Sequence, residues 1–424
     1  MLDQPLRWDL ILERIKFHEI FPLVCRNLRM LNCHGVPPLM RVELESLFRM
    51  NGHRNTMLAG ELAEILRLLD AVGVPAIPLK GIPLSESLYG DISLRVCADI
   101  DILVPRSLLP QSFGAVRRRG YTTDFAPPGV PLERLTKNSI ECFMLRADGS
   151  MTYLLEPHWG ILTGGSLEER AVSDLWVEAQ RAVFFGVPAY RLSPEWEFLF
   201  LAAHAARHEW GKLKWLADLH EICSQRQIDW EKVAKQARLL GWSKLVRLTL
   251  AACRGLLGTQ IPPNFALAMF PPPVTTLPAG SPASWPFHTT FHLLGLLEGT
   301  TRKLRFLIER FLVPTTAEYQ LVQLPSAAHF LYYLLRPLRL VIRLNLWLLS
   351  TGVESVRRFW KRLTSVCFAL AGCCKIPFVR SLTVAARKGL ADVATLTEPR
   401  ALASGPVHQF FNNLLVSNPR RVSR

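Results

Sequence analysis

The 424-residue sequence predicts an α+β fold in which helices precede and follow a small mixed sheet. Residues 1–70 carry apolar side chains at helical spacing, residues 71–192 alternate short β-rich runs with helical stretches, and residues 193–260 return to helical spacing. We therefore predict an N-terminal helical cap, a sheet domain and a helical substrate-side domain. A Pro-rich linker with a helix (261–330) and a basic, apolar helical tail that is partly disordered (331–424) complete the prediction.

The predicted sheet begins with a strand that ends at a lysine–glycine pair. Residues 72–79 are typical of a strand after a turn, and residues 82–88 can start a helix with Pro83 in its first turn. Gly81 lets backbone N–H groups approach an anion, and the helix N-terminus favours negative charge. Lys80 adds a flexible point charge that suits phosphate. The segment therefore predicts phosphate contacts.

Two carboxylates follow in the apolar run DIDILV at residues 99–104. Side chains at i and i+2 of a strand leave the same face, so Asp99 and Asp101 should point together, away from the isoleucines that enter a core. Like charges side by side need a cation, and Mg²⁺ binds one or two carboxylates together with substrate phosphates. An Asp-rich turn with both acids in solvent is the alternative. With the Lys–Gly turn, the pair predicts a nucleoside triphosphate with Mg²⁺ (or Mn²⁺).

A longer pattern joins these features: LKG at 79–81, an arginine at 95, DIDILV at 99–104 and EPHW at 156–159. It resembles the nucleotidyltransferases of the DNA polymerase β-like superfamily, and more closely the uncharacterised bacterial nucleotidyltransferase family proteins. The resemblance extends from about residue 8 to about residue 345. It implies a small mixed sheet with helices on one side, two metal ions and nucleotidyl transfer.

The resemblance also implies a third metal-binding acid at Glu156. The local sequence supports a strand end there, because β-rich runs at 139–147 and 151–155 flank an Asp-Gly-Ser turn. Pro157 is tolerable where a strand ends. Glu141, across the hairpin, is the rival third acid; we prefer Glu156 because a His-Trp pair follows it closely.

Three further side chains belong to the predicted site. The Gly-Ser signature of better-known relatives is absent, so Lys80 would take over the role of that serine. His158 shares a strand face with Glu156 in an extended chain, and we expect it to pack or to support the acids. Arg95 lies in a predicted loop before the acid pair, where its guanidinium fork suits the β- and γ-phosphates. Pairing with Asp91 or bracing the loop is the alternative for Arg95.

Two further elements complete the predicted sheet domain. Residues 107–119 are predicted as a helix, after which a strand starts at residue 120. A β-like pair is expected over residues 182–190.

The helical part begins at Ser193, a predicted N-cap followed by Pro194. On this helix His204 and His208 are four residues apart and share a face, and Asp218 lies in a later Trp-x-x-Asp segment. The resemblance places both elements in the family's helical domain. These side chains either tie the two domains together, line the acceptor or base side of a cleft, or hold zinc. We favour the first, and zinc is the weakest because His-x3-His lacks the glutamate of a metalloprotease helix.

The composition describes a well-packed globular protein, with 49% hydrophobic and 20% charged residues over a length that suits two or three domains. The nine cysteines contain no Cys-x-x-Cys pair. An odd number without a disulfide framework, and without a signal peptide, predicts a reducing cytoplasm and no structural zinc.

Positive charge is concentrated near the C-terminus. Residues 302–424 hold 19 Lys or Arg and 5 Asp or Glu, a net +14 of the chain's +15. Residues 1–301 are therefore almost neutral, unlike an enzyme that binds nucleic acid through many phosphate contacts. The basic tail is the candidate for contact with RNA or an anionic membrane.

The apolar stretch at residues 330–349 carries Arg336, Arg339 and Arg343 at helical spacing. Three arginines and Pro337 argue against a membrane-spanning helix. A cationic face on an apolar helix suits peripheral contact with an anionic bilayer, here the inner membrane face. A helix packed on the protein, with its arginines exposed or paired with acids, is the slightly preferred alternative.

Together these patterns predict a Mg²⁺-dependent nucleotidyltransferase that moves an NMP group from an NTP to a small-molecule, peptide or protein acceptor by a two-metal mechanism. An RNA or tRNA nucleotidyltransferase and a catalytically weak nucleotide-binding regulatory protein are the alternatives. The presence of all three acids and the Lys–Gly pair favours the enzyme. The predicted site consists of Asp99, Asp101 and Glu156 for the metals, and Lys80, Gly81 and Arg95 for the phosphates.

Overall fold

The structure, a computed structural model, describes residues 6–125, 127, 129–162, 166–261 and 287–350. Its contacts divide the chain into two compact units, the first formed by residues 1–126 and 131–280 and the second by residues 127–130 and 281–424. Most of the predicted Pro-rich linker and the predicted tail beyond residue 350 lie outside the described residues.

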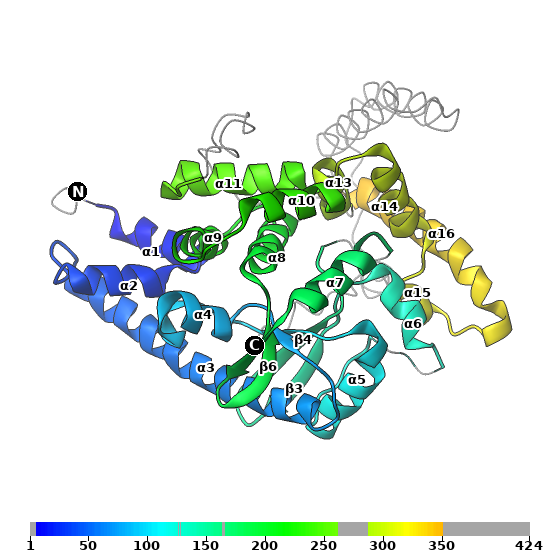
Figure 1. Cartoon of the computed structure of the whole chain (residues 1–424), viewed down its shortest axis with the longest axis horizontal. Coiled ribbons are helices and arrows are strands. Elements are labelled where there is room, and N and C mark those ends of the chain that lie inside the picture. The colour runs from blue at the N-terminus through cyan, green and yellow to red at the C-terminus, as the bar shows by residue number, and fades with distance from the viewer. Residues whose placement is uncertain (1–5, 126, 128, 163–165, 262–286, 351–424) are drawn as a thin grey trace. The chain divides into compact units, whose positions relative to one another are not determined.

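Three helices precede the sheet: α1 (Trp8–Phe17), α2 (Phe21–Met30) and α3 (Pro38–Asp70). The second half of α3 places one apolar face in the main core, where Leu58, Ile65 and Leu69 are fully buried. The helices predicted in residues 1–70 are confirmed. The apolar face of α3 packs this long helix along the sheet (Figure 1).

The first unit contains a four-stranded mixed sheet in the order β1-β2-β4-β3. Its strands are β1 (Ile77–Pro78), β2 (Ile100–Leu103), β3 (Met144–Asp148) and β4 (Met151–His158). β2 and β4 run parallel, while β1 and β3 are antiparallel to their neighbours. The register pairs Asp101 with Glu156 and Leu103 with His158. The predicted α+β fold with a small mixed sheet is therefore confirmed.

Two strand boundaries differ from the prediction because of proline. β1 has two residues instead of the eight expected over 72–79, since Pro75 and Pro78 have no N–H to donate to a strand ladder. β4 continues past Glu156, where we expected it to end. Pro157 lacks only the donor, and its carbonyl accepts a hydrogen bond from the Cys142 N–H (3.2 Å), which keeps β4 paired.

Helices and a hairpin connect and cover these strands. They are α4 (Ile82–Tyr89), α5 (Leu109–Arg118), α6 (Leu132–Leu135), α7 (Ser166–Glu178), β5 (Gln180–Phe184), β6 (Val187–Arg191) and the short 3₁₀ turns η1 (Ile92–Leu94), η2 (Arg106–Leu108) and η3 (Thr136–Asn138). The predicted β pair at 182–190 is the β5–β6 hairpin, which adjoins β1 through a hydrogen bond from the Tyr190 N–H to the Ala76 carbonyl (2.9 Å).

Four helices complete the first unit: α8 (Pro194–Arg207), α9 (Leu213–Gln225), α10 (Trp230–Leu240) and α11 (Ser243–Leu257). The Ser193 hydroxyl accepts a hydrogen bond from the Trp196 N–H (3.4 Å), so the predicted N-cap is confirmed. Trp196 of α8 and Trp242, directly before α11, are fully buried.

The second unit contains α13 (His288–Leu296), α14 (Thr300–Leu312), α15 (Thr316–Leu321), η4 (Ser326–Leu331) and α16 (Tyr332–Ser350). Of the two interpretations of α16, the slightly preferred one, with arginines paired with acids, describes two of its three arginines. Arg336 is buried with its guanidinium 3.1 Å from Glu318, and Arg339 pairs with the same carboxylate. The predicted alternative, pairing with an acid, describes this helix better, because a buried guanidinium requires a partner. None of the described helices is long and apolar enough to cross a membrane.

Candidate active site

The turn between β1 and α4 places Lys80 and Gly81 beside β2. The N–H of Leu79 donates to the carbonyl of Asp101 (3.0 Å), which holds the start of the turn against the acid-bearing strand. Gly81 has a φ of +77°, a conformation that side chains disfavour. A Cβ at this position would lie 3.6 Å from the Asp99 carbonyl oxygen, an ordinary contact. The backbone conformation, and not a lack of space, therefore selects glycine here.

Lys80 contacts both aspartates of the DIDILV run. Its ammonium lies 2.7 Å from Asp101 Oδ2 and 3.5 Å from Asp99 Oδ2. Burial alone would lower the pKa of Lys80, but the charges of Asp101 and Asp99 outweigh burial and raise it. Burial also opposes ionisation of Asp101, yet Lys80 and His158 hold the pKa of that carboxyl well below its usual range. The pair is therefore ionised, with the lysine as its cation.

Glu156 lies beside Asp101 on the neighbouring parallel strand, but its pKa is shifted in the opposite direction. Burial, together with the charges of Asp101 and Asp99, raises the pKa of Glu156 to about 9. Burial and the charge of Asp101 likewise raise the pKa of Asp99. The acid cluster thus holds more carboxylate than Lys80 alone neutralises, which is the electrostatic condition for binding a further cation.

His158 connects the acids to a second carboxylate. Its Nε2 lies 3.1 Å from Asp101 Oδ1 and its Nδ1 lies 3.1 Å from Glu141 Oε2. Burial would raise the pKa of Glu141, but His158 and Arg207 of α8 outweigh it and hold the pKa at about 2. Glu141, the rival third acid of the sequence prediction, therefore lies on the far side of His158 from Asp101, in charge contact with the imidazole but without a hydrogen bond to it.

The residues present fit a divalent cation. Ligand atoms of Asp101, Glu156 and His158 lie within 4.8 Å of one another. Asp101 Oδ2 is buried and close to Lys80 but outside the direction of a hydrogen bond, so among the described residues it has a charge partner and no hydrogen-bond donor. Carboxylate oxygens suit Mg²⁺ or Mn²⁺. Asp99, predicted as a ligand, lies at the edge of this group beside Lys80.

We expected Arg95 to bind phosphate, but in the structure its guanidinium pairs with a carboxylate. It is buried, and its Nε lies 3.0 and 3.2 Å from the two carboxylate oxygens of Asp218 on α9. The hydroxyl of Tyr89 donates to the same carboxylate at 3.0 Å. Asp91, the partner considered for Arg95, instead accepts a hydrogen bond from the Ser93 N–H. Arg95 therefore braces its loop against the α9 helix.

Sequence reasoning missed three side chains that also hold the loop of Arg95, two amides of α3 and a lysine of α9. Asn51 and Asn55 of α3 are buried and both donate to the Arg95 carbonyl, at 3.2 and 2.7 Å. Lys214 of α9 donates to the carbonyl of Val96 at 3.2 Å. The signal available in the sequence was the four-residue spacing of the two asparagines, which places polar groups on a buried helical face.

His204 and His208 lie where α8 ends, and both rings contact Trp215 of α9. The histidine ring centroids are 4.9 Å apart, and they lie 5.4 and 5.1 Å from the indole. Among the described residues no third metal-ligating side chain joins the two histidines, so the zinc alternative gains no support.

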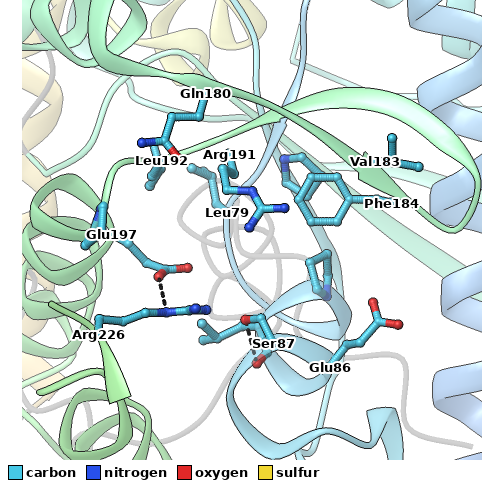
Figure 2. A pocket seen from close by; sticks show the side chains of 14 residues that line it. Leu79, Glu86, Ser87, Gln180, Val183, Phe184, Arg191, Leu192, Glu197 and Arg226 are labelled. Carbon is cyan, nitrogen blue, oxygen red and sulfur yellow. Dashed lines mark hydrogen bonds and ion pairs between the residues drawn. The ribbon is translucent and has the colours of Figure 1, made fainter. Parts of the chain in front are cut away.

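A hollow lies next to the Lys–Gly turn, and none of the acids lines it (Figure 2). It has a volume of about 240 Å³ and is bounded by Leu79, α4, the β5–β6 hairpin and α8. Glu197 and Arg226 pair loosely across it, at 3.8 Å, and Arg191 points into it. No member of the acid cluster lines this hollow.

Comparison with known proteins places the chain in a family. The family model described as uncharacterised nucleotidyltransferase matches residues 4–258. The chain therefore belongs to this family, and it is an enzyme of the nucleotidyltransferase class, as the sequence predicted.

A solved structure of an antigenic nucleotidyltransferase-like protein from Paracoccidioides brasiliensis also matches, with 15% identity and a TM-score of 0.32 over 50% of this chain and 91% of that chain. That likeness is too distant to transfer any residue role. No curated protein matches the chain.

Proposed function

We propose that this enzyme is a divalent-cation-dependent nucleotidyltransferase of the DNA polymerase β-like type, which transfers an NMP group from an NTP to a small-molecule, peptide or protein acceptor. The register between β2 and β4 carries the proposal, because it sets Asp101 beside Glu156. Asp99 lies two residues before Asp101, and Lys80 contacts both aspartates. An acid cluster next to a Lys–Gly turn is suited to metal-bound triphosphate.

Asp99, Asp101 and Glu156 would hold Mg²⁺ or Mn²⁺. When bound, two such cations supply charge that activates the attacking oxygen and stabilises the α-phosphate during in-line displacement. The hydrogen bond between His158 and Asp101 keeps that carboxylate oriented, and Glu141 adds a negative charge beside the imidazole. One of these acids would also accept the proton of the acceptor group.

Lys80 and Gly81 would contact the phosphates. The ammonium of Lys80 contacts both aspartates, so it would be close to the phosphates of a triphosphate whose metal ions those acids hold. Gly81 and the first turn of α4 offer backbone N–H groups to the same anion. Arg95 contributes by bracing the loop before Asp99, through Asp218.

Charge and thiols support our proposals for the acceptor and the compartment. Residues 1–301, which include every proposed site residue, are almost neutral, and this supports a small-molecule, peptide or protein acceptor over RNA. Cys25, Cys33, Cys97, Cys142, Cys223 and Cys253 have free thiols, which supports a reducing, cytoplasmic environment.

The proposal is tested by transfer of label from each of the four α-³²P NTPs with Mg²⁺ or Mn²⁺, with cell lysate as the source of acceptors. Wild type should label a product, and Asp101→Asn should reduce labelling to background. Asp148→Asn, at an exposed position on β3, is the matched control and should retain full activity. Circular dichroism confirms folding of each variant. Labelling that persists in Asp101→Asn would contradict the proposed site.

A further inference from the structure

A row of aromatic rings leads away from the acid cluster, and we propose that its outer part binds the base of the nucleotide by stacking. The ring row consists of His158, Phe200, His204, His208 and Trp215. This inference rests on the proposed function, and it assigns to α8 and α9 the recognition of the nucleobase, as distinct from the triphosphate.

Successive ring contacts connect the row to the acids. His158, which contacts Asp101, lies edge-on to Phe200 with centroids 6.3 Å apart. The next step is from Phe200 to His204, at 6.4 Å and an interplanar angle of 25°. Two ring contacts therefore connect the imidazole that contacts Asp101 with His204. We place the base at the outer rings and the phosphates at the acids.

The outer rings form one aromatic surface. His208 lies 5.1 Å from Trp215 at an interplanar angle of 30°, and His204 meets the same indole edge-on at 5.4 Å. His208 is exposed, while His204 and Trp215 are half-buried, so solvent reaches these rings. Aromatic side chains that are accessible in this way stack on any of the four bases.

The electrostatics of His204 suit a base better than a phosphate. Burial lowers its pKa, and the positive charges of Lys80 and Arg207 lower it further. A neutral imidazole offers one donor and one acceptor to the edge of a base and does not compete with Lys80 for the phosphates.

The position of the row relative to the acids is held by buried contacts. Asp218 lies one helical turn after Trp215 on α9, and its carboxylate binds Arg95 and Tyr89 of the segment between β1 and β2. The network is almost inaccessible to solvent, with 5% of Arg95 and 1% of Asp218 exposed. The rings and the acids are thus parts of one preorganised surface.

The test compares binding of two ligands to the full chain by isothermal titration in the presence of Mg²⁺. One ligand is a non-hydrolysable α,β-methylene NTP analogue, and the other is inorganic triphosphate, which has no base. We expect Trp215→Ala and His204→Ala to weaken binding of the analogue by about tenfold or more, because stacking is lost. Binding of triphosphate should be unchanged, and Trp215→Phe should restore most of the affinity for the analogue.

Trp230→Ala on α10 and His53→Ala on α3 are the matched controls, since neither ring belongs to the row. Equal affinity of wild type and the ring variants for the analogue would overturn the inference while leaving the proposed function intact. Loss of NMP transfer with unchanged analogue binding would also overturn it and would assign the row to the acceptor. Failure of wild type to bind either ligand would instead overturn the proposed function.

Discussion

Lys80 is the residue on which the charge balance of the site depends. Its side chain is 8% exposed and is the nearest cation to Asp101, which has no exposed side-chain surface. Ionised groups at such depth are tolerated only when they are paired. The ammonium of Lys80 therefore balances the charge of the aspartates in the cation-free protein. A divalent cation bound at the same acids would supply positive charge in its place.

We expect Lys80→Met to destabilise the cation-free protein by about 3 kcal/mol, because the variant leaves buried carboxylates without their cation. Added Mg²⁺ should raise the melting temperature of the variant more than that of wild type, since the ion replaces the missing charge. Thermal denaturation in EDTA and in Mg²⁺ measures both effects. Lys235→Met, at an exposed position on α10, is the control. A melting temperature that Mg²⁺ raises in neither protein would contradict a cation site at these acids.

At the scale of elements, Glu61 connects the long helix α3 to the sheet. Only 2% of its side chain is exposed, and its carboxylate binds the guanidinium groups of Arg119 and Arg146, each at 2.7 Å. The hydroxyl of Tyr121 donates to the same group at 3.0 Å. One carboxylate thus joins α3, the end of α5 and β3, and a helix four times the length of α4 is anchored against the sheet.

This cluster predicts sensitivity to acid. Burial opposes ionisation of Glu61, but Arg119 and Arg146 outweigh it and lower its pKa below the usual 4.5. Its stabilising contribution is therefore complete above that value and is lost as the pH falls through the lowered pKa. We expect Glu61→Gln to cost about 3 kcal/mol at pH 7 and the difference from wild type to shrink near pH 3.

Urea denaturation of both proteins at pH 7, 4 and 3 checks this expectation. Glu64→Gln, one turn later and half exposed, should change the unfolding free energy by less than about 1 kcal/mol. A difference between wild type and Glu61→Gln that does not vary with pH would show that the carboxylate is not the titrating group.

At the scale of the whole molecule, every proposed site residue belongs to the first compact unit. The family match at residues 4–258 falls within the same part of the chain. The strongly basic segment, residues 302–424, belongs to the second unit. The proposed site and the concentrated positive charge therefore belong to different parts of the sequence.

A chain that ends at residue 280 should consequently fold and bind the NTP analogue with the affinity of the full chain, within about threefold (about 0.7 kcal/mol). Circular dichroism and isothermal titration test this. Loss of binding in a folded truncated chain would show that the second unit contributes to the nucleotide site. Loss of folding would show that the first unit depends on the second for stability.

Local patterns were sufficient for much of the fold and for the composition of the acid cluster. The helices flanking the sheet, the β3–β4 hairpin and the shared face of Asp99 and Asp101 follow from periods of 3.6 and 2, which backbone geometry imposes wherever a helix or strand forms. Strand ends were less predictable. A proline removes a donor and keeps an acceptor, so its effect at Pro78 and Pro157 depends on which neighbour is present.

The sequence by itself determined which residue types stand near the Lys–Gly turn and that the protein is an α+β nucleotidyltransferase. Only the tertiary structure decided their partners. Arg95 binds Asp218, 123 positions away, and Glu141 approaches His158 through a bridge between separate segments. Neither pairing is encoded in local spacing, because each depends on how distant elements pack. The physical reason is that a buried charge takes the partner that the packed chain brings within reach, whatever its distance along the sequence.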